Sequence, residues 1–136
     1  MKFIFKQFII LILSLILIVL GFYIAIQLTY KVEYKVIVEK YSKEFGIEEE
    51  LIFAIIKNES NFKKNVVSNK DAIGLMQILE STKKDMEEVL GVEGLDLKKD
   101  VDNILVVTKY LSILKQKYDS IELAIAAYNA GPRECR

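Results

Sequence analysis

Hydrophobic side chains form one long run near the start of the chain, followed by short periodic clusters. Residues 7–30 carry no charged side chain and are mostly Ile, Leu, Val or Phe. A helix of about 24 residues spans roughly 36 Å, which exceeds the ~30 Å hydrocarbon core of a bilayer. The pattern therefore predicts a cytoplasmic stub and one transmembrane helix within residues 1–30, and a separate domain over residues 31–136.

The end of the apolar run favours a retained signal-anchor over a cleaved signal peptide. A signal peptide usually has a hydrophobic stretch of ~7–15 residues that ends at small residues of the Ala-x-Ala type. Here the run is longer, and residues 23–28 read Tyr-Ile-Ala-Ile-Gln-Leu. The short basic N-terminus with Lys2 and Lys6 favours a cytoplasmic N-terminus, so we expect residues 31–136 to lie outside the cell membrane.

The first part of the domain is expected to be helical, although its pattern is mixed. Residues 31–38 alternate between polar and apolar positions, which also suits a strand. Helix is favoured because Val38, Tyr41 and Phe45 continue at helical spacing. Gly46 then follows as a typical helix stop.

Four further helices are predicted from apolar stripes and from residues that suit helix ends. They cover about residues 48–59, 81–90, 101–118 and 121–129. Ser81 suits an N-cap of the second of these, and either Asp119 or Ser120 suits an N-cap of the fourth. Gly131 suits a left-handed terminator before Pro132, which cannot continue a helix. We expect a mainly α domain of about five short helices around one core.

Composition excludes several kinds of site. The sequence contains no histidine, which excludes Ser-His and Cys-His nucleophile pairs and histidine-based zinc sites. Cys135 is the only cysteine, so an intrachain disulfide is excluded. Without Lys2 and Lys6, 17 basic residues stand against 19 acidic ones. The sequence also lacks a basic stripe of the kind that binds nucleic acid, so its charge pattern does not indicate a nucleic-acid partner.

Glu59 is the carboxylate that the pattern singles out. It continues the line of Leu51 and Ile55 at i, i+4 and i+8, so a carboxyl group extends an otherwise apolar stripe. It also falls in the last turn of its predicted helix, at the negative end of the helix dipole. Both features favour the uncharged carboxyl that a general acid needs. The alternative is an ordinary glutamate at a helix end whose side chain extends into water.

Three motifs accompany Glu59 in a fixed order. They read Glu-Ser-Asn-Phe at 59–62 with Ser68, Ala-Ile-Gly-Leu-Met-Gln at 72–77, and Ala-Ala-Tyr-Asn-Ala-Gly-Pro at 126–132. Together, over about residues 36–132, they resemble the soluble lytic transglycosylase family. The resemblance implies a mainly α, lysozyme-like fold preceded by the transmembrane helix, and a domain that faces the cell wall.

The resemblance also implies a role for each matching position. Glu59 corresponds to the family's catalytic acid/base, and Ser68 to a serine whose hydroxyl orients that carboxyl. The implied substrate-binding or orienting residues are Ser68, Met76, Gln77, Tyr128 and Asn129. Gly74 fits the tight turn before Gln77. Asn103 resembles a residue that opens a long helix, and we interpret it as structural.

The implied reaction needs one carboxyl group, no metal and no organic cofactor. Glu59 protonates the oxygen between N-acetylmuramic acid (MurNAc) and N-acetylglucosamine (GlcNAc), and then accepts the proton of the 6-hydroxyl that attacks the anomeric carbon. The product is a 1,6-anhydro sugar. The implied partners are peptidoglycan glycan strands, and the membrane through the N-terminal helix.

Three departures from the family pattern keep alternatives open. Asp71 stands where glycine is usual, Glu80 stands where proline is common, and the sequence stops at Arg136. We therefore expect the domain to be incomplete at its C-terminus. The alternatives are a lysozyme-type hydrolase, an inactive peptidoglycan-binding module and a membrane scaffold that holds partners.

Overall fold

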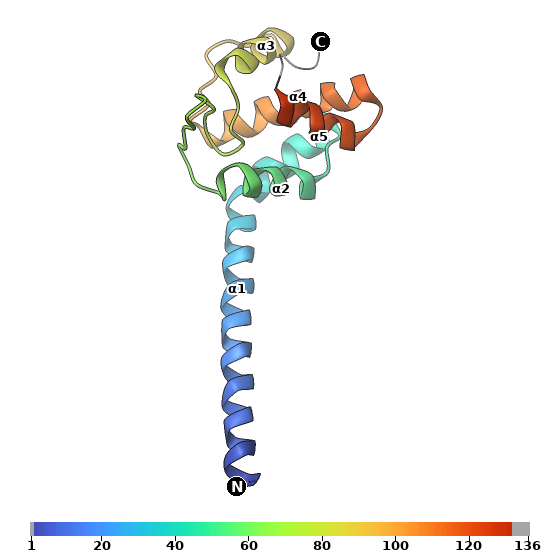
Figure 1. Cartoon of the computed structure of the whole chain (residues 1–136). Coiled ribbons are helices and arrows are strands. Elements are labelled where there is room, and N and C mark those ends of the chain that lie inside the picture. Colours follow the sequence, from blue (N-terminus) through green and yellow to red (C-terminus); the bar gives the residue numbers. More distant parts are fainter. Residues whose placement is uncertain (1, 132–136) are drawn as a thin grey trace. The chain divides into compact units, whose positions relative to one another are not determined.

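The computed structural model describes residues 2–131, which fall in two compact units that divide between Lys35 and Val36. The described residues form five helices (Figure 1), namely α1 (Lys2–Phe45), α2 (Glu49–Ser60), α3 (Glu80–Leu90), α4 (Asp100–Tyr118) and α5 (Ile121–Ala130). Two isolated bridges, Val67 to Ile73 and Ile73 to Ile78, lie between α2 and α3. The prediction of a mainly α fold is confirmed. Pro132 and Cys135 lie outside the described residues.

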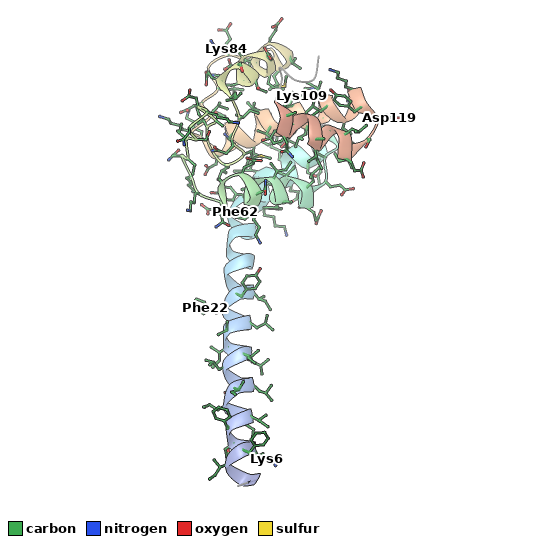
Figure 2. The ribbon with its side chains drawn as sticks, in the orientation of Figure 1. Lys6, Phe22, Phe62, Lys84, Lys109 and Asp119 are labelled. Atoms are coloured by element: carbon green, nitrogen blue, oxygen red, sulfur yellow. The ribbon has the colours of Figure 1, made fainter. Side chains whose placement is uncertain are left out.

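The first unit is helical and apolar. The stretch Ile4–Ala25 of α1 has 22 residues and a mean hydropathy of 3.1. At ~1.5 Å per residue it spans about 33 Å, which is enough to cross a bilayer as an anchor or to serve as a signal sequence. Its large apolar side chains, such as Phe22, are exposed (Figure 2). Length and composition are therefore consistent with a membrane-spanning segment.

The strand alternative for residues 31–38 is wrong, because α1 continues without a break to Phe45. Gly46 ends the helix with a φ of 68°. The amides of Gly46 and Ile47 both donate to the carbonyl of Ser42, at 2.9 and 3.3 Å. This pair of bonds satisfies a carbonyl that the helix end would otherwise leave without a partner.

Helix α4 lies at the centre of the second unit, and Figure 1 draws it between α2 and α3. It packs against both α5 and α3. Its buried residues are Asn103, Ile104, Val106, Val107, Thr108, Leu111, Ser112 and Leu114. The predicted apolar face of this helix is therefore buried, and polar side chains share the core with it.

One predicted helix cap is wrong, and a second has another backbone conformation than expected. Helix α3 begins at Glu80 with Leu79 in the N-cap position, so Ser81 lies inside the first turn and does not cap the helix. Gly131 ends α5 as predicted, but with φ 82° and ψ 165°, an extended conformation that is essentially restricted to glycine, instead of the left-handed helical conformation. Both features were expected from residue type, but the neighbouring backbone decides that Leu79 occupies the N-cap of α3 and which conformation Gly131 adopts.

Ser120, one of the two caps considered for α5, is the N-cap. Its Oγ accepts a hydrogen bond from the amide of Leu123 at 3.3 Å. Asp119 instead ends α4 with a φ of 49°. Asp119 therefore ends α4 and Ser120 caps α5. The short turn that they form orients α5 against α4.

Candidate functional site

Glu59 lies in the last turn of α2, and this turn is held by the core. Ile55 and Ile56 are 7% and 0% exposed, whereas Glu59 is half-buried. The hydroxyl of Ser60 is buried and donates to the carbonyl of Ile56 at 3.1 Å. Asn61 then ends the helix in a left-handed conformation. The carboxyl group of Glu59 is thus presented from a fixed backbone at the edge of the core.

Ser68 organises the turn that follows, over residues 68–72. Its Oγ accepts hydrogen bonds from the amides of Lys70 at 3.2 Å and Ala72 at 3.1 Å. Its backbone amide donates to the carbonyl of Ala72 at 2.9 Å. Because the hydroxyl accepts in both side-chain bonds, its own proton remains available to donate. Asp71 adopts a φ of 58°, the left-handed conformation that glycine favours and aspartate tolerates.

Asn103, a residue of α4, holds the turn around Gly74 in place by hydrogen bonds. Its side chain is fully buried, and its Oδ1 accepts from the amide of Met76 at 2.9 Å. Its Nδ2 donates to the carbonyls of Ile73 and Leu97, both at 2.9 Å. The interpretation of Asn103 as structural is confirmed. The close packing of Asn103 against this turn requires a glycine at position 74, because a Cβ there would lie 2.2 Å from the Asn103 Nδ2.

Gln77 presents a hydrogen-bond acceptor to the site. Its Nε2 donates to the carbonyls of Val66 at 3.1 Å and Gly74 at 2.9 Å. Both partners are acceptors, so the nitrogen of the side-chain amide must face them, and both of its protons are used. The remaining polar atom is Oε1, which can only accept a hydrogen bond.

A hydrogen bond from Tyr128 joins α5 to the turn that contains Met76. Tyr128 is 9% exposed, and its hydroxyl donates a hydrogen bond to the carbonyl of Met76. Burial raises the pKa of this hydroxyl, and the negative charge of Glu59 raises it further. The ring also lies against Tyr110 of α4, with 6.2 Å between centroids and a tilt of 51°. The phenol therefore stays protonated and holds the backbone at Met76.

These segments enclose a cavity of about 340 Å³. The predicted site residues that line it are Glu59, Ser68, Gln77, Tyr128 and Asn129. Met76 does not line the cavity; its side chain is fully buried. The structure therefore places Met76 in the core, where its backbone bonds to Asn103 and Tyr128.

Several lining residues were not recognised from the sequence, among them Lys70, Thr82 and Tyr110. Tyr110 stands seven residues after Asn103, on one face of α4, so helical spacing was a usable signal for it. Lys70 lies in an irregular turn, where the sequence has no periodicity from which the direction of its side chain could be predicted. The described residues contain no cluster of three or more His, Cys, Asp or Glu residues suited to a metal ion.

Replacement of Tyr128 by phenylalanine is expected to destabilise the fold by about 1–3 kcal/mol, because it leaves the carbonyl of Met76 buried without its partner. The midpoint of urea unfolding, followed by circular dichroism, measures this loss. Tyr118→Phe, at the less buried end of α4, is a matched control. Equal midpoints for the two variants would contradict a supporting role for the Tyr128 hydroxyl.

Residues 36–136 match the family model described as the transglycosylase SLT domain. Membrane-bound lytic murein transglycosylase C of Pectobacterium atrosepticum is 39% identical over 112 residues, covering 73% of this chain and 31% of that protein. The protein of the same name from Serratia proteamaculans is 37% identical over the same shares. The chain thus spans about a third of the length of these relatives.

Two solved structures share the fold of the second unit. An inactive mutant of the lytic transglycosylase Slt from Pseudomonas aeruginosa matches with a TM-score of 0.68 and 31% identity, over 73% of this chain and 17% of that one. The 70-kDa soluble lytic transglycosylase from Escherichia coli matches with a TM-score of 0.68 and 30% identity, over the same shares. The expected lysozyme-like helical fold is confirmed.

Proposed function

The chain belongs to the transglycosylase SLT domain family, and we propose that it is a lytic transglycosylase that cleaves the MurNAc–GlcNAc bond of peptidoglycan glycan strands. The observation that carries the proposal is the cavity that brings together Glu59, Ser68 and Gln77. The three side chains come from different segments of the chain and supply complementary hydrogen-bonding groups. A cavity with one acid and several neutral polar groups beside it suits this reaction.

In the first step, Glu59 donates a proton to the oxygen that bridges the two sugars. The bond from this oxygen to the anomeric carbon of MurNAc breaks, and the N-acetyl oxygen of the same sugar stabilises the positive charge that develops. The free Oε1 of Gln77 can accept a hydrogen bond from the carboxyl proton or from a sugar N–H or O–H. The hydroxyl of Ser68 can donate to the carboxylate that remains.

In the second step, the Glu59 carboxylate accepts the proton of the 6-hydroxyl of MurNAc, and O6 bonds to the anomeric carbon. Glu59 returns to its protonated form, and a 1,6-anhydro sugar is released without consumption of water. Two-carboxylate glycosidases need a second acid across the scissile bond. Among the described residues that line the cavity, Glu59 is the only acid, which supports a mechanism with one carboxyl group.

The products identify the reaction. We expect the full chain in detergent to release muropeptides with 1,6-anhydro ends from purified peptidoglycan, each one water lighter than the corresponding hydrolytic product by mass spectrometry. Reducing ends would identify a lysozyme-type hydrolase instead. Binding to peptidoglycan without any released product would favour the binding-module alternative, and failure to bind it would favour the scaffold.

The N-terminal helix supports a location at the membrane, with the second unit facing the cell wall. The relatives carry "membrane-bound" in their names, and the stretch Ile4–Ala25 is long enough to hold the chain in a bilayer. We propose that this stretch is a retained anchor with the N-terminus in the cytoplasm. Alkaline extraction of membranes tests this: an anchored chain stays in the membrane pellet at full length, and a shortened soluble chain would indicate a cleaved signal.

A further inference from the structure

We propose that Lys70 binds a carboxylate carried by the glycan, and so selects strands whose muramyl sugars bear an acidic substituent. The inference rests on the proposed function. Lys70 is exposed and lines the same cavity as Glu59. It is the only basic residue among the described residues that line this cavity. The cavity therefore has one acid at the reacting bond and one cation for an anionic group of the ligand.

The backbone of Lys70 is held in a fixed position beside the site. Its amide donates to the Ser68 Oγ at 3.2 Å, inside the turn that Ser68 closes. The next residue, Asp71, donates its amide to the carbonyl of Ser68 at 3.0 Å. The same turn carries Ser68, which lines the cavity together with Glu59. A long side chain that starts from this fixed position can reach a ligand group without rearrangement of the backbone.

The ammonium group of Lys70 is free to bind a ligand. Within the described part of the chain it forms no ion pair or hydrogen bond. Two other lysines of the second unit differ in this respect. Lys64 pairs with Asp100 at 3.4 Å, and Lys83 lies between Glu80 and Glu87. Lys70 thus keeps an unpaired positive charge at the cavity, whereas Lys64 and Lys83 are paired with acids.

The chemistry of the glycan indicates which group this charge recognises. MurNAc differs from GlcNAc by a lactyl ether, whose carboxyl group is either free or joined to a stem peptide that carries carboxylates of its own. A polymer of GlcNAc alone has neither. An exposed ammonium–carboxylate pair contributes up to ~1 kcal/mol, which corresponds to a binding effect of about two- to fivefold. Lys70 therefore adjusts selectivity among glycans, and the neutral groups of the cavity supply the rest of the affinity.

Binding of three glycan probes of equal length tests the proposal. The probes are a muramyl oligosaccharide with stem peptides, the same oligosaccharide with the peptides removed to leave free lactyl carboxylates, and a chitooligosaccharide. The full chain with Glu59→Gln, in detergent at low salt, prevents turnover during titration calorimetry. Added to that background, Lys70→Ala is expected to weaken binding of a carboxylate-bearing probe by about two- to fivefold and to leave the chitooligosaccharide unchanged.

Two further variants and a salt titration complete the test. Lys70→Arg should retain the affinity, and Lys84→Ala, on an exposed position of α3 (Figure 2), should have no effect. The difference caused by Lys70→Ala should diminish as salt is added. Which acidic probe is affected identifies the lactyl or the peptide carboxylate as the ligand. Equal loss with the chitooligosaccharide, or no loss with either acidic probe, would overturn the proposal, while absence of all glycan binding in the background variant would overturn the proposed function.

Discussion

Replacement of Glu59 by glutamine is expected to lower the rate of glycan cleavage by about 10²–10⁴-fold, while glycan binding is retained. The amide has nearly the shape of the carboxyl group but can neither donate the proton in the first step nor accept the one in the second. Because one group serves both steps, we expect the loss to lie at the upper end of this range. Gln77 and Ser68, which line the same cavity, are unchanged in this variant, so the sugar binding that we propose for them should persist.

Release of muropeptides from peptidoglycan measures the rate, and sedimentation with insoluble peptidoglycan measures binding. Glu50→Gln is a matched control, because Glu50 is an exposed carboxylate at the opposite end of the same helix. The control should cleave at the unmodified rate. Residual cleavage above a tenth of that rate in Glu59→Gln would mean that another group supplies the proton, and the assignment of Glu59 would be wrong.

Replacement of Gly74 by alanine is expected to destabilise the second unit by more than about 3 kcal/mol. The left-handed conformation, with a φ of 82°, costs an alanine about 1–2 kcal/mol. Its Cβ would also lie 2.2 Å from the Asn103 Nδ2 and 2.5 Å from the carbonyl of Leu97. Asn103 would have to move, and each buried hydrogen bond that it loses costs about 1–3 kcal/mol. Domains are stable by only ~5–15 kcal/mol, so a large share of the native stability would be lost.

Gly91→Ala separates the steric effect from the conformational one. Gly91 has a φ of 66°, but a Cβ there would meet no atom within 4 Å. Urea unfolding of the two variants, followed by circular dichroism, should show a loss of about 1–2 kcal/mol for Gly91→Ala and at least twice that for Gly74→Ala. Similar losses in the two variants would contradict the close approach of Asn103 to this turn.

Local sequence patterns were enough to predict the five helices and the place of Glu59 in the last turn of α2. Apolar residues at helical spacing, such as Ile52 and Ile56 in α2 or Ile104 and Leu111 in α4, are buried as predicted. Gly46 marks a helix end for local reasons, since it adopts a positive φ that other residues tolerate poorly. These features depend on interactions within a few residues, so the order of side chains along the chain is enough to specify them.

How the segments of the site come together depends on long-range packing, which only the three-dimensional structure shows. This packing placed Met76 in the core, directed the hydroxyl of Tyr128 to a backbone carbonyl, and brought Lys70 to the cavity of Glu59. The physical reason is that these contacts join segments up to 52 residues apart, as in the bond from Tyr128 to Met76. Their geometry depends on how α4 and α5 pack against the turns at residues 68–77. No pattern of neighbouring residues in the sequence predicts that packing.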